Sequence, residues 1–478
     1  MSRNENFVNN TPSPEERARE LLGKMTLPEK IGQISQSIYG FYCYDRDGDT
    51  VRIGKDVIEE VEKFGGIGGI YGLFRADPWS GRTFETGLVG TLAPKLRNDI
   101  QRYVIENTRL GIPVLFSNEC PHGTMTLGGY MLPVNLASAC TFSPSLVQKA
   151  FTVCARQMKE MGLDIALVSI MDVLRDPRWG RSEETFGEDP FLVSTMCRSV
   201  VTALKSEGVG VCAKHFAAHG ETNGGINSSP ANIGERELRE IHIPPAKAAV
   251  EAGAETFMAT YNEIDGVYCC ANSHLLRDIL RDELGFKGVV MADALAIESM
   301  NDMTGGDASS SALAIRSGVD MGLLDKSVEA LDQAIENGEI SMEYIDEAVL
   351  RILTLKYERG LFDNPYVPEN DHWTTYTKEN DPTSVQLTEE AMVLLKNEGD
   401  VLPLDKSKKI TVGITGPSAD HIYRQMGDYT PPLLPGTYST ILSGLKDYAD
   451  KTVGNITVKC RTAAHSFFTF PSNISCRS

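Results

Sequence analysis

The feature that most constrains the fold is a long alternation of short apolar runs with amphipathic stretches. Seven runs have the length and composition of buried strands, and the segments between them have helical periodicity. The runs span residues 68–74, 113–119, 164–172, 208–216, 254–262, 288–294 and 318–324. This alternation predicts a parallel α/β fold. Seven strands, with an eighth possible, fit a TIM-type (β/α)8-like barrel better than two small Rossmann units.

The chain is predicted to hold one large domain and the beginning of another. We expect residues 1–360 to form the barrel-like domain, which ends in a helix over 341–360 with Gly360 as its stop signal. Residues 361–384 are polar and proline-rich, as in a linker. Residues 385–478 are predicted to be the truncated start of a second α/β domain, with a helix over 385–399, a strand over 409–416 and a helix over 440–450.

The end of the chain shows no clear periodicity and few charges. Its last stretch, CRTAAHSFFTFPSNISCRS, continues neither the helical nor the strand pattern. We therefore expect that the natural continuation is missing, through truncation or a change of reading frame. The alternative is an irregular tail.

Charge and composition exclude several classes of partner. The formal net charge of −19 repels nucleic acid and anionic membranes, and suits a neutral ligand better than a phosphorylated one. No run of about 18 apolar residues could span a bilayer, and the N-terminus lacks an apolar signal core. The ten cysteines contain no CxxC pair and no zinc spacing. These features predict a cytoplasmic protein with reduced cysteines and no cofactor, and they leave the oligomeric state open.

One carboxylate stands at the end of the best-defined strand. Val289, Val290 and Met291 form a short apolar run that ends at Asp293. Burying a carboxylate without a partner is costly, and catalytic side chains sit at the carboxyl ends of barrel strands. Asp293 could instead be the N-cap of the following helix.

Polar groups also follow the other predicted strands. Glu119 ends the second, Lys214 and His215 end the fourth, and Tyr261 ends the fifth. The arginine-rich segment 171–190 follows the third. Each has a structural alternative, such as a salt-bridge network, a surface position or a core position. Together they would line one pocket with donors, a carboxylate and aromatic faces, which suits a neutral polyhydroxylated ligand.

Five segments carry a specific resemblance to a known family. They are NECPHG (118–123), DPRWGRSEETFGEDP (176–190), KHFAAHGE (214–221), MATYNEIDG (258–266) and GVVMADALAI (288–297). In order and strand-end placement they resemble the barrel domain of glycoside hydrolase family 3, which includes β-glucosidases and β-xylosidases. The similarity runs from about residue 15 to about residue 450. The segment after residue 385 and GDYTPP (427–432) resemble the start of the family's second, α/β-sandwich domain.

The resemblance implies a function and a set of site residues. We expect an exo-acting retaining β-glycosidase that removes β-D-glucosyl or β-D-xylosyl ends from a small oligosaccharide or an aryl β-glycoside. Asp293 would be the nucleophile, and Lys214 and His215 would bind the hydroxyls of the sugar that is cleaved off. Arg181 would bind hydroxyls and keep Asp293 ionised. The resemblance assigns roles to three further residues. Glu119 would bind the hydroxyls far from the anomeric carbon, Tyr261 would lie beside the nucleophile, and Met258 would line the pocket.

Two departures from the family pattern affect this expectation. Ala294 follows the nucleophile where many members have a tryptophan that would support the leaving group. The family usually takes its acid/base from the second domain, and no residue after 385 can be assigned to that role. Glu183 and Glu184 lie in the right neighbourhood, but the resemblance does not support them as the acid. A catalytically impaired sugar-binding fragment is therefore one alternative.

Three other functions stay open at this point. The β-N-acetylglucosaminidase branch of the family is one, although its Asp-x-His loop is not apparent after KHFAAHGE. His215 and His219 have the i, i+4 spacing of a helical metal pair, but the HExxH glutamate and a third ligand are missing. Lys214 at a strand end could form a Schiff base, as in aldolases. We expect no metal site.

Overall fold

The computed structural model describes residues 12–405, 407–451 and 456–461. Contacts between residues divide the chain into two compact units. The first comprises the described residues up to Met392 together with the short segment Tyr429–Pro432, and the second comprises Val393–Asp428 and the chain from Leu433 onwards.

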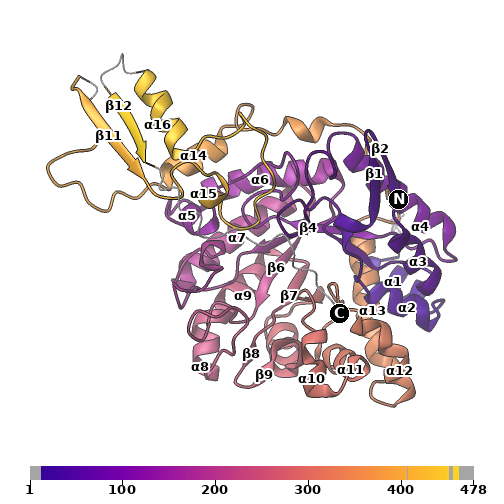
Figure 1. The fold of residues 1–478 in the computed structure, drawn as a ribbon. Coiled ribbons are helices and arrows are strands. Elements are labelled where there is room, and N and C mark those ends of the chain that lie inside the picture. The colour runs from indigo at the N-terminus through magenta and orange to yellow at the C-terminus, as the bar shows by residue number, and fades with distance from the viewer. Residues whose placement is uncertain (1–11, 406, 452–455, 462–478) are drawn as a thin grey trace, which may run out of the picture. The chain divides into compact units, whose positions relative to one another are not determined.

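A parallel sheet forms the centre of the first unit (Figure 1). Its strand order is β10-β7-β6-β5-β4-β3, and every neighbouring pair is parallel. The strands are β3 (Gly69–Tyr71), β4 (Leu115–Glu119), β5 (Ile165–Ser169), β6 (Gly210–Phe216), β7 (Thr256–Ala259) and β10 (Val289–Ala292). Six of the seven predicted strands are therefore present, and their residues are buried on both faces.

Two less regular segments close the sheet into a barrel. The seventh predicted strand, 318–324, pairs with β10 through a Met291–Met321 bridge. The same segment donates hydrogen bonds from Gly322 N to Ile34 O and from Leu324 N to Gln36 O. The segment that begins at Ile34 reaches β3 through a Tyr39–Tyr71 bridge and supplies the eighth position. The predicted TIM-type barrel is confirmed.

Helices follow the strands and surround the sheet (Figure 1). They are α1 (Pro14–Leu22), α2 (Leu27–Ile34), α3 (Lys55–Phe64), α4 (Leu92–Asn107), α5 (Asn135–Ala139), α6 (Pro144–Met161), α7 (Pro190–Ser206), α8 (Glu235–Glu237), α9 (Ile243–Ala252), α10 (Asn301–Thr304), α11 (Asp307–Ser317), α12 (Leu331–Glu336), α13 (Met342–Glu358) and α14 (Thr383–Glu390). The loops contain two small antiparallel hairpins. One pairs β1 (Tyr44–Asp47) with β2 (Thr50–Ile53), and the other pairs β8 (Glu263–Ile264) with β9 (Val267–Tyr268).

The proline pair at 244–245 has the effect expected from its chemistry. A proline in a helix interior removes a hydrogen bond and clashes with the preceding turn, but it is tolerated in the first turn. The structure accordingly ends a short wide helix at His242 and begins α9 at Ile243, which places Pro244 in the first turn. Residues His274–Glu283 form a wide π-type helix where an ordinary α-helix is predicted.

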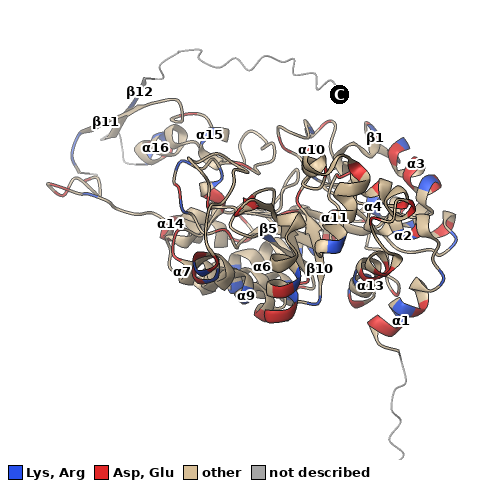
Figure 2. Ribbon diagram, turned by 90° about the horizontal axis from the view of Figure 1, so that it is seen from below, with Lys and Arg blue, Asp and Glu red and all other residues tan. Residues whose placement is uncertain are grey.

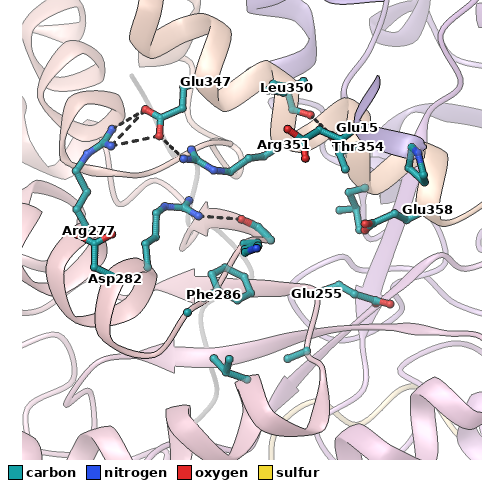
Figure 3. A pocket seen from close by; sticks show the side chains of 18 of the residues that line it. Glu15, Glu255, Arg277, Asp282, Phe286, Glu347, Leu350, Arg351, Thr354 and Glu358 are labelled. Carbon is teal, nitrogen blue, oxygen red and sulfur yellow. Dashed lines mark hydrogen bonds and ion pairs between the residues drawn. The ribbon is translucent and has the colours of Figure 1, made fainter. Parts of the chain in front are cut away.

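A network of ion pairs fills the amino-terminal end of the barrel (Figure 3). Asp320 receives hydrogen bonds from Arg281 at 2.6 Å and from Arg351 at 2.8 Å. Glu347 accepts from Arg277 and Arg351. The pocket that Arg277, Arg281, Glu347 and Arg351 line also includes Gly288, which precedes β10. The pocket therefore lies at the amino-terminal end of the strands. In barrels, residues at that end contribute to stability rather than to catalysis.

The predicted linker packs on the first unit. Trp373 is buried and donates from its indole nitrogen to Gly90 O, while Gln157 of α6 donates to Trp373 O. Asn98 of α4 donates to Val367 O. These contacts hold residues 365–373 against α4 and α6.

The second unit contains β11 (Ile410–Thr415), α15 (Tyr423–Met426), α16 (Ile441–Asp450) and β12 (Ile456–Arg461), with β11 and β12 parallel. The helix predicted over 385–399 is wrong beyond Glu390, where α14 ends. Met392 and the three apolar residues after it are exposed and not helical. Four consecutive apolar residues lack helical periodicity, so no apolar face stabilises a helix there.

The acidic charge is distributed on the outside. Figure 2 shows acidic and basic residues interleaved on outer helices such as α1 and α3, where Glu15 pairs with Arg19 and Glu59 with Lys55. Within the described ranges, no helix is both long enough and apolar enough to cross a bilayer.

Candidate active site

Asp293 follows the last residue of β10 and is nearly fully buried. Its backbone N–H donates to Ala259 O of β7, and its Oδ1 accepts from the Ala294 N–H at 2.8 Å. Its Oδ2 has no hydrogen-bond partner among the described residues, and His215 Nε2 lies 3.5 Å away. Burial raises the pKa of Asp293 to about 6, against the opposing effects of Arg181 and Lys214. The structure thus presents a buried carboxylate with one unengaged oxygen, and Asp293 does not cap a following helix.

Arg181 connects two histidines to this carboxylate. Its guanidinium lies 3.1 Å from His215 Nε2 and 3.1 Å from His219 Nε2. Because a guanidinium can only donate hydrogen bonds, both Nε2 atoms must accept, and each imidazole carries its proton on Nδ1. His215 Nδ1 then donates to Asp172 at 2.6 Å, and His219 Nδ1 donates to Thr260 Oγ1 at 2.8 Å. Burial and the nearby Arg181 lower the pKa of His215 well below its ordinary value, which is consistent with a neutral ring.

Glu184 holds Arg181 in place. The two side chains pair through bonds of 2.6 and 2.9 Å, and Ser169 Oγ donates a third bond to Glu184 at 2.7 Å. Although burial opposes it, the guanidinium lowers the pKa of Glu184. A carboxylate with a lowered pKa stays ionised and cannot supply a proton near neutral pH.

Lys214 and Glu119 form a second buried pair. Lys214 Nζ donates to Glu119 Oε2 at 2.7 Å, and Tyr71 donates to Glu119 Oε1 at 2.8 Å. Burial alone would lower the pKa of Lys214, but the Glu119 carboxylate raises it above its ordinary value. The ammonium therefore stays charged. An ammonium has three donors, of which Glu119 takes one.

Tyr261 and Met258 come from β7 and the segment after it. Burial and the nearby Asp293 carboxylate raise the pKa of Tyr261. Met258 is buried on β7, opposite Met291 of β10. The structure therefore brings Glu119, Arg181, Lys214, His215 and Tyr261 into a connected group around Asp293, and it gives Met258 a place on the adjoining strand.

Comparison with known proteins shows the family of the chain. The sequence model described as the glycosyl hydrolase family 3 N terminal domain matches residues 26–355, and the one described as the family 3 C-terminal domain matches residues 392–470. The chain belongs to glycosyl hydrolase family 3.

Individual relatives are glucosidases and xylosidases. A β-xylosidase of Formosa agariphila is 35% identical over 403 residues, which are 77% of this chain and 56% of the relative. A solved β-glucosidase structure from Erythrobacter marinus has a TM-score of 0.82 and 31% identity, over 95% of this chain and 58% of that one. A β-glucosidase of Listeria innocua solved with glucose has a TM-score of 0.79 and 28% identity, over 94% and 60% of the two chains. The chain spans a little over half the length of these family 3 proteins.

Several site residues were not predicted from the sequence. Asp172 lies three residues after the end of β5 and closes the predicted run 164–172, so the strand-end rule that gave Glu119 could have found it. The same rule could have found Tyr71, which ends β3, and Arg75, which follows β3. Tyr429 has no such signal. It reaches Arg181 through its hydroxyl at 3.2 Å, and its ring lies 4.9 Å from Lys214 Nζ.

Two alternatives lose support from these contacts. The Nε2 atoms of His215 and His219 accept from Arg181 and so have no free lone pair for a metal. In the described part of the chain, no group of three or more His, Cys, Asp or Glu side chains is arranged to hold a metal ion. A Schiff base requires an unprotonated lysine, whereas Glu119 keeps Lys214 charged.

Proposed function

We propose that this family 3 protein is a retaining, exo-acting β-glycosidase for β-D-glucosides or β-D-xylosides. The observation that carries the proposal is the unengaged Oδ2 of Asp293, buried beside His215 and held between the charges of Arg181 and Lys214. A nucleophilic carboxylate must be ionised and free to approach carbon. A pKa of about 6 leaves Asp293 largely ionised at pH 7.

The first step follows from this geometry. Asp293 Oδ2 attacks the anomeric carbon, the bond from that carbon to the leaving-group oxygen breaks, and a glycosyl ester of Asp293 forms. Water then hydrolyses the ester and restores the carboxylate. Lys214, Glu119, His215 and Arg181 would bind the hydroxyls of the cleaved sugar, with Tyr261 beside the nucleophile and Met258 on the wall.

Protonation of the leaving group is the demanding part of the reaction. Glu184 is ionised by Arg181, and Asp172 is engaged by His215, so neither is suited to be the acid. We therefore expect substrates whose leaving groups depart as stable anions to react far faster than alkyl glycosides. A catalytically impaired sugar-binding protein is the second candidate, favoured because none of the described residues around Asp293 is suited to be the acid.

The domain division stays a prediction. The family N-terminal match over 26–355 supports a barrel over 1–360, and the C-terminal match over 392–470 supports the start of a sandwich over 385–478, with a linker over 361–384 between them. The proposed partner is a small oligosaccharide or an aryl β-glycoside.

Covalent labelling tests the nucleophile. A dinitrophenyl glycoside with fluorine beside the anomeric carbon should form a stable ester on Asp293, which peptide mass spectrometry locates. The Asp293→Asn variant should not label, whereas Asp302→Asn, a matched change at an exposed aspartate of α10, should label at the original rate. Paired gluco- and xylo-reagents identify the preferred sugar. Labelling elsewhere, or equal labelling of the Asp293→Asn variant, would overturn the assignment.

A further inference from the structure

Arg75 is a nearly buried arginine close to the candidate active site. It follows β3 and is 9% exposed. Its Nε and Nη2 both donate to Asp77 Oδ2, at 3.0 and 2.6 Å, and its Nη1 donates to the hydroxyl of Tyr71. A guanidinium has five N–H donors, and its hydrogen bonds to the described residues use three of them. Two N–H groups are therefore left to donate to a ligand.

Arg75 borders the same space as the carboxylate of Glu119. Tyr71 accepts from Arg75 and donates to Glu119 Oε1 at 2.8 Å, and Arg75 Nη1 itself lies 3.9 Å from that oxygen. Lys214 Nζ donates to the other oxygen, Oε2, at 2.7 Å. The ring centre of Tyr429 lies 5.7 Å from Arg75 Cζ and 4.9 Å from Lys214 Nζ. The two cations thus lie near one aromatic ring, on either side of one carboxylate.

The surrounding loop fixes the direction of the guanidinium. Asp77, which holds Arg75, is itself held, because its N–H donates to Ser80 Oγ at 2.9 Å and its Oδ1 accepts from the Ser80 N–H at 2.7 Å. The ring of Trp79 lies 4.4 Å from Arg75 Cζ. A side chain that is ordered in advance loses little further freedom when a ligand binds. Arg75 therefore presents its remaining donors in a set geometry.

We propose that Arg75 is a further substrate-binding residue, which donates a hydrogen bond to the hydroxyl at C4 of the terminal sugar. The inference rests on the proposed function, in which Glu119 binds the hydroxyls far from the anomeric carbon. C4 lies directly across the sugar ring from the anomeric carbon, so its hydroxyl is the ring hydroxyl nearest to Glu119. A carboxylate accepts and a guanidinium donates, so one hydroxyl donates to Glu119 and accepts from Arg75.

This pairing defines the class of sugar that the site accepts. β-D-Glucosides and β-D-xylosides share an equatorial hydroxyl at C4, so both should depend on Arg75. A sugar that continues into a chain through its C4 oxygen has no proton there to donate to Glu119. A site built to bind a hydroxyl rejects a ligand that leaves its buried polar groups unpaired. Arg75 and Glu119 together therefore select a terminal sugar with a free C4 hydroxyl, which gives a physical reason for exo cleavage.

Deoxy substrates combined with substitutions test this contact. The 4-hydroxyl ratio is kcat/KM for a nitrophenyl glycoside divided by kcat/KM for its 4-deoxy analogue. Hydrogen bonds to charged groups predict a ratio of about ten to a hundred in the unaltered protein. Arg75→Met alone would leave Asp77 buried and unpaired, so the variant is Arg75→Met/Asp77→Asn. In it the 4-hydroxyl ratio should fall about five- to tenfold.

Two controls separate direct binding from a structural role. The 3-hydroxyl ratio, measured with the 3-deoxy analogue, should stay within about twofold in the double variant, whereas a distorted pocket would lower both ratios. Arg82→Met is the matched substitution on the same loop. Arg82 donates to Phe41 O at 2.6 Å and lies 4.5 Å from the ring of Tyr44. It should change neither ratio.

A second variant guards against misfolding. Arg75→Lys keeps a positive charge beside Asp77 but lacks the planar fork, so the 4-hydroxyl ratio should fall in it as well, and circular dichroism identifies the folded variants. An unchanged 4-hydroxyl ratio in a folded variant, or an equal fall in both ratios, would overturn the role of Arg75 while leaving the glycosidase intact. Failure of the unaltered protein to cleave the parent glycoside would overturn both proposals.

Discussion

Removing the charge of Arg181 should make the nucleophile harder to ionise. Arg181 Nη2 and Asp293 Oδ2 each contact His215 Nε2, at 3.1 and 3.5 Å, so they are at most about 6.6 Å apart. At an effective dielectric constant of about 20, that separation corresponds to about 2.5 kcal/mol, or about 1.8 pH units. Loss of the charge should therefore raise the pKa of Asp293 from about 6 to nearly 8.

The sign of the effect is fixed by which form reacts. Only ionised Asp293 attacks, so activity falls as pH decreases through its pKa. With the pKa raised by about 1.8 units, the ionised fraction at pH 7 drops about sevenfold, and most of that loss disappears near pH 9. Lost contacts to the sugar would reduce the rate equally at every pH, so they leave the position of the acid limb unchanged.

The measurement is the rate of covalent labelling of Asp293 as a function of pH, with the dinitrophenyl fluoroglycoside. This reagent needs no proton on its leaving group, so the profile reports the nucleophile alone. Arg181→Met by itself leaves Glu184 buried and unpaired, which destabilises the fold. The double variant Arg181→Met/Glu184→Gln removes both charges, and Arg181→Lys restores a charge without the bidentate pairing. Because the Glu184 charge is lost as well, the double variant is compared with Glu184→Gln alone, and an acid limb at the same pH in both folded variants would refute the reasoning.

Two further substitutions test the surroundings of the site. Glu119→Gln removes the charged partner of Lys214, and a charge-assisted hydrogen bond is worth about 1.5 to 3 kcal/mol. We expect kcat/KM for an activated glycoside to fall about ten- to a hundredfold, and a loss under twofold would contradict the assigned role. Lys356 is fully buried, and burial lowers its pKa from 10.5 to about 7. The unfolded state therefore binds more protons between pH 7 and pH 10.5, and stability should rise with pH across that window. Relative to Lys356→Met, the free energy of unfolding should increase by about 2 to 4 kcal/mol between pH 7 and pH 10, as measured by urea denaturation. If the free energy of unfolding depends on pH in the same way in both proteins, the lowered pKa of Lys356 is refuted.

The strand-end rule explains why much of the site was predictable. Glu119, Lys214, His215 and Asp293 each lie at the end of a short apolar run, and a parallel barrel brings those ends together. The parallel topology of the barrel is enough to explain why these four residues lie close together. The same rule applied more strictly would have added Asp172, which closes the run 164–172.

Other features depend on contacts that local sequence does not encode. Tyr429 lies 248 positions from Arg181, and no spacing rule relates them. The barrel closure at 34–39 is likewise made by single bridges and isolated backbone hydrogen bonds rather than by a regular ladder, and its sequence lacks a strand signature. The helix predicted beyond Glu390 is wrong for a different reason. The apolar residues there were interpreted as a helical pattern, although they lack helical periodicity.

The hydrogen-bond chain around Arg181 explains how a buried carboxylate oxygen can remain unengaged. An imidazole 3.5 Å from Asp293 Oδ2 would ordinarily donate a proton to it. Here Arg181 donates to His215 Nε2, and the Nδ1–H donates to Asp172, so Nε2 carries no proton that it could donate to Asp293. Oδ2 is thereby deprived of a donor although basic side chains surround it. This arrangement attracts the charge of the carboxylate over several ångströms without forming the hydrogen bond that would reduce its nucleophilicity.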